Sequence, residues 1–231
     1  MKDFSTFEKN IGIIFKDKEL LKQAFTHRSY INENPGMKTG HNERLEFLGD
    51  AVLELVTTEE LFKRFSHKPE GELTSLRAAL VNTNSISVAA KKWEANDYLL
   101  LSKGESKDTG KARGYILANT FEAIVGAIYL DSGYDNAKKF IAESLFDNIE
   151  AIVRDKTYID SKSLVQEKSQ EIFAVTPSYD VISEVGPDHD KYFTIGIYFG
   201  EEKIAEGRGK SKQEAEQEAA RAALIRNKWI D

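Results

Sequence analysis

The 231-residue sequence contains no cysteine, and this absence excludes several kinds of site at once. Without thiols the chain has no disulfide framework, no thiolate metal site and no cysteine nucleophile. A cysteine-free chain fits a reducing compartment, so we expect a cytoplasmic protein. Its content of 41% apolar and 10% aromatic residues is sufficient for one or two domains with real hydrophobic cores.

Long hydrophobic runs are also lacking. The most apolar stretch, ILANTFEAIVGAIYL (116–130), is shorter than the roughly 18 residues that a membrane span needs, and it contains Asn119, Thr120 and Glu122. The first ten residues mix charges of both signs and hold no apolar segment followed by small residues, so no signal peptide is expected. We therefore expect no association with a membrane.

The sequence also lacks a surplus of basic residues. Residues 1–154 carry 21 basic and 23 acidic side chains, and residues 155–231 carry 11 and 15, so the net charge of −6 divides into −2 and −4. This balance alone argues weakly against a nucleic-acid partner, because phosphate binding usually shows as a basic excess. Any nucleic-acid-binding face must be a local patch.

Most of the first 150 residues have apolar side chains at helical spacing. Helices are predicted over 17–27, with Asp17 as N-cap, and from about residue 42 to 65. The segment 72–93 is predicted as one helix or two, because Asn82, Thr83 and Asn84 form a plausible break and cap. A polar loop over 102–114 precedes a helix over 116–130, and another amphipathic helix lies within 131–153. The predicted core stripe of the helix over 42–65 is Leu45, Leu48, Val52, Leu55 and Val56.

The pattern changes after a short linker, 154–160. A predicted helix over 163–173 is followed by β-rich runs over 178–185, 191–199 and 203–209. The last helix begins with Ser211 and Glu214, which have the Ser-x-x-Glu spacing of a capping box. The predicted fold is thus an all-α domain, 1–153, followed by a small α+β domain of order αβββα, 161–231. The sequence shows no internal repeat and no low-complexity tract.

Three acidic residues share one face of the long helix over 42–65. Glu43, Glu46 and Asp50 stand at i, i+3 and i+7. Glu46 and Asp50 are also a like-charge pair at i, i+4, which costs a few tenths of a kcal/mol unless a cation lies between them. A solvated acidic stripe would give the same pattern, so spacing alone leaves both interpretations open.

Glu122 is the one charged residue in the apolar stretch 116–130, and Asn119 precedes it by one turn. A partly buried carboxylate needs a partner, and no cation stands at i±3 or i±4. Two helices that present Glu46 with Asp50 and Asn119 with Glu122 would suit Mg²⁺, and Gly49 and Gly126 would let those helices cross closely. The alternative is a hydrogen bond or a salt bridge to an arginine such as Arg44 or Arg77.

Several segments resemble one family in the right order. THRSY (26–30), HNERLEFLGDAVL (41–53), EGELTSLRAALV (70–81) and ILANTFEAIVGAIYLDSG (116–133) resemble the landmarks of ribonuclease III, and the C-terminal part is similar to a double-stranded-RNA-binding domain. The resemblance covers nearly the whole chain. It implies a double-strand-specific endoribonuclease of RNA processing and decay, which hydrolyses phosphodiesters with Mg²⁺, or Mn²⁺ in its place, as a symmetric homodimer. The expected products carry 5′ phosphates, 3′ hydroxyls and short 3′ overhangs, and no small-molecule cofactor is expected.

The resemblance also assigns roles in the nuclease part by position. It implies that Glu46, Asp50, Asn119 and Glu122 hold the metal, with Asp50 and Glu122 catalytic. Glu43 and Glu70 are implied accessory carboxylates, although Glu70 equally fits an acid that favours a helix N-terminus. Phe47 matches an aromatic residue that enters a socket on the partner subunit; a single Phe on a helix is otherwise more often part of the core.

Asn119 departs from the family pattern, which has Asp at this position. An amide oxygen can still bind a metal directly or through water, but one negative charge is lost. A second hypothesis is therefore a protein that binds duplex RNA without cutting it. A third, a helical scaffold with a small αβββα module, predicts neither binding nor cleavage.

In the C-terminal part the resemblance implies contacts with an A-form duplex, which is read mainly by shape. Ser163 and Gln166 match positions in one minor groove, and His189 matches the next, although an exposed loop histidine fits as well. Lys210, Ser211 and Lys212 open the last helix, where they would meet phosphates. Family members commonly continue with basic residues, whereas this chain has Gln213, Glu214, Glu216 and Glu218. Lys107, Lys111 and Arg113, in the polar loop, either add contacts with RNA or form a solvated charge run.

Overall fold

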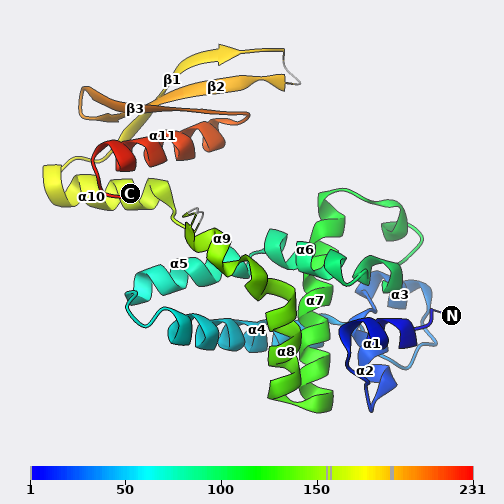
Figure 1. Cartoon of the computed structure of the whole chain (residues 1–231). Helices are drawn as coiled ribbons and strands as arrows, with labels where there is room; N and C mark the ends of the chain where they lie inside the picture. Colours follow the sequence, from blue (N-terminus) through cyan, green and yellow to red (C-terminus); the bar gives the residue numbers. More distant parts are fainter. Residues whose placement is uncertain (1, 155, 157, 188–189, 231) are drawn as a thin grey trace. The chain divides into compact units, whose positions relative to one another are not determined.

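The computed structural model describes residues 2–154, 156, 158–187 and 190–230. The chain forms two compact units, Met1–Tyr158 and Ile159–Asp231. Figure 1 shows helices throughout the first unit and the three strands in the second. The fold class is therefore the one predicted, a helical domain followed by a small αβββα domain.

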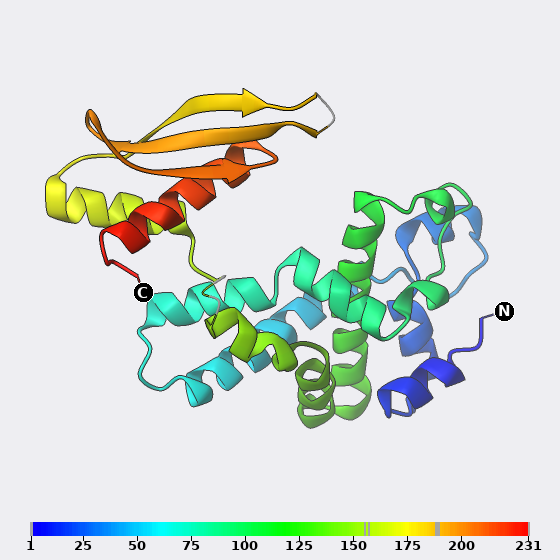
Figure 2. The same cartoon turned by 45° about the horizontal axis from the view of Figure 1, so that its top comes forward.

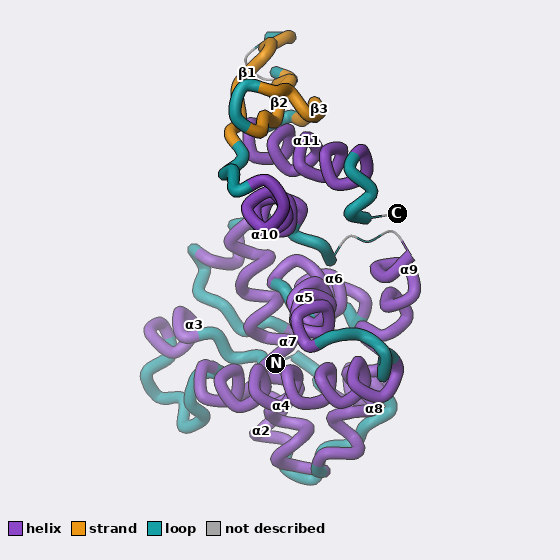
Figure 3. Tube along the Cα trace, turned by 90° about the vertical axis from the view of Figure 1, so that its left-hand side faces the viewer, coloured by secondary structure: helices purple, strands orange, loops and turns teal. Residues whose placement is uncertain are grey.

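The helices of the first unit pack around two long ones, α4 (Glu43–Arg64) and α7 (Lys111–Ser132), which cross each other (Figures 1 and 3). Helix α7 is buried on most of its surface, which explains why its sequence is apolar on nearly every face. The other α-helices of this unit are α1 (Ser5–Ile11), α2 (Lys18–Ala24), α3 (Arg28–Glu33), α5 (Glu70–Leu80), α6 (Thr83–Lys92), α8 (Tyr134–Leu145) and α9 (Ile149–Arg154). Short 3₁₀ turns are η1 (Ala95–Tyr98), η2 (Glu105–Lys107) and η3 (Phe146–Asn148). No helix in the described part of the chain is both long and apolar enough to cross a membrane.

Side-chain caps set several of the predicted helix boundaries. The Asp17 carboxylate accepts a hydrogen bond from the Glu19 N–H, so the first predicted helix begins where expected. The side-chain oxygen of Asn82 accepts a hydrogen bond from the Ser85 N–H, and this cap separates α5 from α6. Of the two alternatives for 72–93, the break is thus confirmed.

Other boundaries differ from the predictions. Helices α1 and α3 were not predicted; with 7 and 6 residues they are too short for a clear helical period. Helix α7 begins at Lys111 and not after the polar loop, so Lys111 and Arg113 belong to its first turn. The predicted core stripe of α4 is wrong at Leu55, which is 58% exposed, whereas Leu45, Val52 and Val56 are buried.

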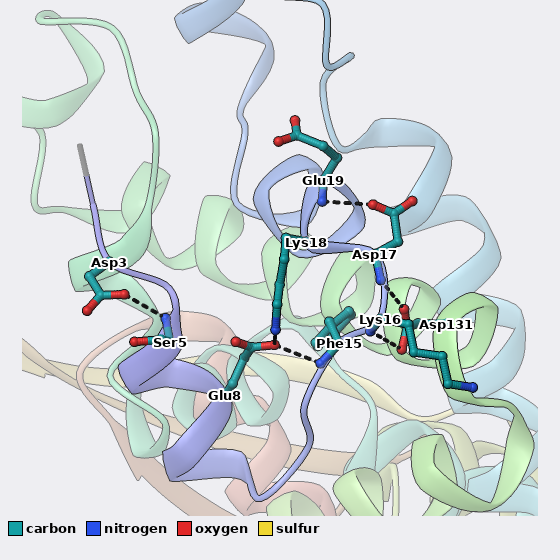
Figure 4. A network of polar contacts seen from close by, with 9 residues as sticks. All are labelled: Asp3, Ser5, Glu8, Phe15, Lys16, Asp17, Lys18, Glu19 and Asp131. Carbon is teal, nitrogen blue, oxygen red and sulfur yellow. Dashed lines mark hydrogen bonds and ion pairs between the residues drawn. The ribbon is translucent and has the colours of Figure 1, made fainter.

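Polar contacts fix the N-terminal segment against the rest of the first unit (Figure 4). The buried Glu8 carboxylate accepts hydrogen bonds from the Phe15 N–H (2.7 Å) and from the Lys18 ammonium (2.5 Å). The Asp131 carboxylate, at the end of α7, accepts from the N–H groups of Lys16 (3.1 Å) and Asp17 (2.8 Å). The loop before α2 is therefore held by one carboxylate from α1, Glu8, and by one from the end of α7, Asp131.

The second unit is a three-stranded antiparallel sheet of order β1-β2-β3 with two helices on one face (Figure 2). Its elements are α10 (Ser161–Phe173), β1 (Ser178–Val185), β2 (Tyr192–Phe199), β3 (Glu202–Gly209) and α11 (Lys212–Arg226). Helix α11 lies directly on β3: a Cβ atom added at Gly207 would stand 2.1 Å from the Ala219 nitrogen. Only glycine permits this approach of helix and strand.

Caps also define both helices of this unit. The Ser211 hydroxyl accepts from the Glu214 N–H (3.1 Å), and the Glu214 carboxylate accepts from the Lys210 N–H (2.8 Å), one residue before the cap. This is the predicted capping box with its return bond displaced by one residue. Helix α10 begins two residues earlier than predicted, because the Asp160 carboxylate accepts from the N–H groups of Lys162 and Ser163.

Candidate functional site

Helices α4 and α7 touch through two glycines. A Cβ atom added at Gly49 would lie 1.7 Å from the Glu122 carbonyl oxygen, and one added at Gly126 would lie 2.3 Å from the Leu45 carbonyl oxygen. Backbone meets backbone at this crossing, so no larger residue fits at either position. The side chains flanking the two glycines are thereby brought together: Glu46 and Asp50 from α4, and Asn119 and Glu122 from α7.

Glu122 is half-buried at this crossing, and its pKa is raised to about 7. Burial is the largest cause, followed by the negative charges of Asp50 and Glu46. No hydrogen bond or ion pair to the Glu122 carboxylate occurs within the described part of the chain. Arg77, one of the two partners considered, binds Glu54 instead at 2.8 Å. Arg44 is exposed and forms no described ion pair with Glu122.

Glu46, also half-buried, has a raised pKa for related reasons. Burial contributes most and the charge of Glu43 comes next, while a hydrogen bond with Asn119 acts in the opposite direction and Asp50 adds a smaller increase. Asn119 and Asp50 themselves are exposed. Asn119 thus links the two helices, since its amide stabilises the charged form of a carboxylate across the crossing.

The arrangement concentrates negative charge around Glu122 and supplies oxygen ligands only, which is the donor set that Mg²⁺ prefers. Within the described residues no group of three or more His, Asp or Glu side chains stands at metal-ligand spacing. A cation at this crossing would therefore draw further ligands from the Asn119 amide, from water and from a substrate phosphate, as Mg²⁺ commonly does.

The two accessory carboxylates differ in their surroundings. Glu43 lies one turn before Glu46, 3.5 Å from the Arg28 guanidinium and 3.7 Å from His41 Nδ1. Glu70 lies in the first turn of α5, where its carboxylate accepts from the Thr74 hydroxyl at 3.0 Å. No described hydrogen bond or ion pair connects Glu70 with the α4–α7 crossing, so its position fits an acid at a helix N-terminus.

Phe47 points away from the core. Its side chain is 83% exposed, so the alternative that it belongs to the core of its own unit is wrong. Leu55 (58% exposed) and Phe62 (71% exposed) lie on the same face of α4, because residues 8 and 15 positions after Phe47 fall within about 80° of it on a helix. Phe62 was not predicted as a functional residue and Leu55 was predicted to lie in the core, although the spacing of both from Phe47 is that of a second apolar stripe.

The predicted RNA-contacting residues of the second unit are exposed. Ser163 and Gln166 lie on α10, where the Ser163 hydroxyl donates to Asp160 (2.7 Å). Lys210 lies 3.3 Å from Asp190, and Lys212 lies 3.8 Å from Glu184. Ser211 is exposed as the N-cap of α11. His189 lies outside the described residues. The acidic residues of this unit therefore compete with phosphates for both lysines.

Arg113 has a structural role that the sequence did not indicate. Its guanidinium donates to the carbonyl oxygens of Glu105 (2.7 Å) and Asp108 (2.8 Å) and to the Asn96 side chain (3.1 Å), and so ties the polar loop to α7. Lys107 and Lys111 are exposed.

Comparison with known proteins identifies both units. Residues 17–149 match the family model described as Ribonuclease-III-like, and residues 161–226 match the one described as double-stranded RNA binding motif. The chain is 45% identical over 221 residues to Ribonuclease 3 from Borreliella burgdorferi, covering 95% of this chain and 89% of that protein. It is 45% identical over 217 residues to Ribonuclease 3 from Enterococcus faecalis, covering 94% of each.

The first unit also matches solved structures of the nuclease domain of ribonuclease III from Campylobacter jejuni. One aligns with a TM-score of 0.57 and 42% identity, over 64% of this chain and 97% of that one. Another, described as showing structural flexibility in a region involved in dimer formation, aligns with a TM-score of 0.56 and 42% identity, over 62% of this chain and 98% of that one.

Proposed function

The chain belongs to the ribonuclease III family, and from this membership we propose how its residues cut double-stranded RNA. Its activity is that of an endoribonuclease specific for double-stranded RNA. The observation that carries the proposed site is Glu122: a half-buried carboxylate with no cationic partner in the described part of the chain, facing two further carboxylates across a glycine crossing.

Glu46, Asp50, Asn119 and Glu122 would hold Mg²⁺, or Mn²⁺ in its place, at the crossing of α4 and α7. Their oxygen-only donor set fits that ion, and a cation there would offset both the burial and the repulsion from Asp50 and Glu46 that raise the pKa of Glu122. The chemistry that the ion supplies when bound is activation of a water nucleophile and neutralisation of charge on the phosphate.

The chain's own groups position that chemistry. Asp50 and Glu122 approach from different helices and would hold the ion that binds the reacting phosphate, and Asn119 favours the charged form of Glu46. Glu43, beside Arg28 and His41, stands one turn before Glu46 and would act as an accessory carboxylate near the RNA. Hydrolysis by water needs no amino-acid nucleophile, and it leaves 5′-phosphate and 3′-hydroxyl ends.

Two such sites would act in a homodimer, one on each strand, so that the staggered cuts give short 3′ overhangs. The surface that supports this assembly is the exposed apolar face of α4, formed by Phe47, Leu55 and Phe62. A relative from Campylobacter jejuni is described as having a region involved in dimer formation in the same domain. We assign to Phe47 the role of entering the partner subunit.

The second unit would bind the duplex by its shape. Ser163 and Gln166 are exposed on α10 for one minor groove, and Lys210, Ser211 and Lys212 gather at the N-terminus of α11 for phosphates. Because Asp190 and Glu184 lie beside the two lysines, binding must displace these acidic side chains. We expect modest affinity and a strong dependence on salt.

The test is cleavage of a long duplex RNA in Mg²⁺ by the chain and by its Glu122→Gln variant, with binding measured on the same RNA in EDTA. We expect the variant to bind as the parent does and to lose at least a thousandfold in cleavage rate, since a charged ligand is removed. A Gln variant that still cuts at a comparable rate would refute the assignment of Glu122.

Asn119 favours a second candidate function, duplex binding without cleavage. The amide supplies an oxygen but no charge, so the crossing has one negative charge fewer than a site with Asp. Tight binding with no products in either Mg²⁺ or Mn²⁺ would support this candidate. The variant Asn119→Asp distinguishes an impaired metal site from a chain that does not cut for another reason.

A further inference from the structure

A second site lies at the start of α7, away from the carboxylates. A surface cleft of about 850 Å³ lies between α6, the polar loop and the first turn of α7. Three cationic side chains line it, Lys91, Lys111 and Arg113, and no carboxylate does. In a chain with a net charge of −6, such a lining is selective for anions.

The backbone adds positive potential at the same place. Helix α7 is 22 residues long, Gly110 is its N-cap, no side chain caps it, and its first turn contains no acidic residue. The first N–H groups of a helix have no partner within the helix, and the helix dipole is positive at this end. Gly110 and Gly114 both line the cleft and leave this backbone accessible. The Gly110 N–H donates to the Asp108 carboxylate (2.8 Å) and the Arg113 N–H donates to the Gly110 carbonyl oxygen (3.1 Å), so the N–H groups of Lys111 and Ala112 are the ones that an anion would meet.

Ser87 gives an independent indication of a ligand. It lies on α6, is only 5% exposed and lines the cleft, and no hydrogen bond to its hydroxyl occurs among the described residues. Its oxygen lies 3.8 Å from the place where a Cβ atom on Gly114 would stand, so it is close to the first turn of α7. The residue is largely buried, but its hydroxyl oxygen is not among the fully buried atoms that lack a partner, so it is open to the cleft and available to an oxyanion there.

Two of the three cations are available to such an anion. Arg113 is occupied by the loop carbonyls described above, whereas Lys91 and Lys111 form no ion pair in the described part of the chain. Most other lysines near carboxylates are paired, for example Lys63 with Glu59. Other lysines, among them Lys38 and Lys103, also form no described ion pair, so what distinguishes Lys91 and Lys111 is their place in the lining of the cleft, with Ser87 and the first turn of α7.

We propose that this cleft binds a phosphate group through the Ser87 hydroxyl, the first N–H groups of α7 and the ammonium groups of Lys91 and Lys111. The site is separate from the carboxylates, because Asn119 stands eight residues beyond Lys111, about 12 Å along the helix. The group comes either from free phosphate and nucleotides or from the backbone of a duplex. This proposal does not depend on the cleavage site, so either proposal can fail while the other holds.

The probe is inorganic phosphate, titrated into the full chain by calorimetry at constant ionic strength set with KCl, together with the thermal midpoint. We expect phosphate to bind and to raise the midpoint. Ser87→Ala and Lys111→Gln should each weaken binding at least tenfold, while Lys103→Gln, an exposed loop lysine outside the cleft, should leave it unchanged. Ser87→Ala should leave the midpoint without phosphate unchanged, because its hydroxyl forms no described hydrogen bond within the protein.

No binding by the parent chain would overturn the proposal, as would equal binding by the parent and Ser87→Ala, or an equal loss in Lys103→Gln. A repeat titration on the protein saturated with a short duplex RNA in EDTA identifies the source of the phosphate. Loss of the phosphate signal assigns the site to a backbone phosphate, and retention assigns it to free phosphate or a nucleotide.

Discussion

Glu122 determines the electrostatics of the α4–α7 crossing. It is partly buried, it faces Asp50 and Glu46, and its pKa is raised to about 7. In metal-free protein its ionised form is therefore less stable in the folded state than in the unfolded state. A residue that lowers stability until a cation arrives is typical of a metal ligand and not of a structural ion pair.

The first prediction is that Glu122→Gln stabilises the metal-free protein at high pH. Because the folded-state pKa is raised above 4.5, the folded protein binds more protons between about pH 4.5 and 7, and its free energy of unfolding falls as pH rises through this window. The full pKa shift of Glu122 corresponds to roughly 3 kcal/mol in the free energy of unfolding. Solvent screening reduces the expected gain of the Gln variant to about 1–2 kcal/mol at pH 8. Urea unfolding in EDTA at pH 5 and pH 8 measures the difference.

Glu54→Gln is the matched control on the same helix, because Glu54 is ion-paired with Arg77. Its removal should leave the free energy of unfolding at pH 8 unchanged or lower it by less than about 1 kcal/mol. The interpretation of Glu122 fails if its Gln variant is no more stable than the parent at pH 8.

At the scale of elements, the glycine contact between α4 and α7 sets the site. We predict that Gly126→Ala destabilises the protein by at least about 2 kcal/mol, because the new methyl group would lie 2.3 Å from the Leu45 carbonyl oxygen and must push the helices apart. The cleavage rate should fall by a larger factor than the loss of stability alone explains, because Glu46 and Glu122 move apart. Thermal unfolding and single-turnover cleavage measure the two effects.

Gly71→Ala provides the comparison. Gly71 lies in α5 with nothing within 4 Å of an added Cβ atom, so alanine should be neutral or stabilise by up to about 1 kcal/mol. If Gly126→Ala behaves like Gly71→Ala, the close crossing does not exist as described.

Local signals predicted much of the element structure. Asp17, Asn82 and Ser211 are caps whose side chains bond to nearby N–H groups, and such contacts depend on a few neighbouring residues. The short helices α1 and α3 escaped prediction because they depend on tertiary packing and not on a long helical period.

Tertiary relations were less accessible. The sequence placed Glu46 with Asp50 and Asn119 with Glu122, and the glycines suggested a close crossing. Only the structure showed that neither Arg44 nor Arg77 pairs with Glu122 among the described residues. The exposure of Leu55 could not be read from α4, because apolar residues on two faces give one continuous pattern in a long helix. The cleft at Ser87 forms where residues 83–96 pack against residues 106–117, and no local pattern in the sequence indicated that contact.

At the scale of the whole molecule, the exposed apolar face of α4 requires a partner. Three large apolar side chains exposed on one face of a helix, Phe47, Leu55 and Phe62, are unfavourable in water. We predict that Phe47→Ala raises the dissociation constant of the homodimer at least tenfold, about 1.4 kcal/mol, with little change in monomer stability. Sedimentation equilibrium over a concentration series measures the constant.

Ile14→Ala serves as the control, because Ile14 is 66% exposed but belongs to the loop between α1 and α2 and not to the apolar face of α4. It should leave the dissociation constant unchanged. A parent chain that stays monomeric at high concentration, or equal effects of both variants, would contradict the proposed dimer.

The central claim is that the carboxylates at the α4–α7 crossing, with Asn119 in place of an acid, form a working metal site. The most direct measurement is the single-turnover rate of duplex RNA cleavage as a function of Mg²⁺ concentration, for the chain and for Asn119→Asp, resolved on a sequencing gel. We predict that both proteins cut at the same positions and that the Asp variant reaches its half-maximal rate at a lower Mg²⁺ concentration, since a charge is restored. A chain that binds the duplex but cuts at no Mg²⁺ concentration, with or without the substitution, would contradict the claim.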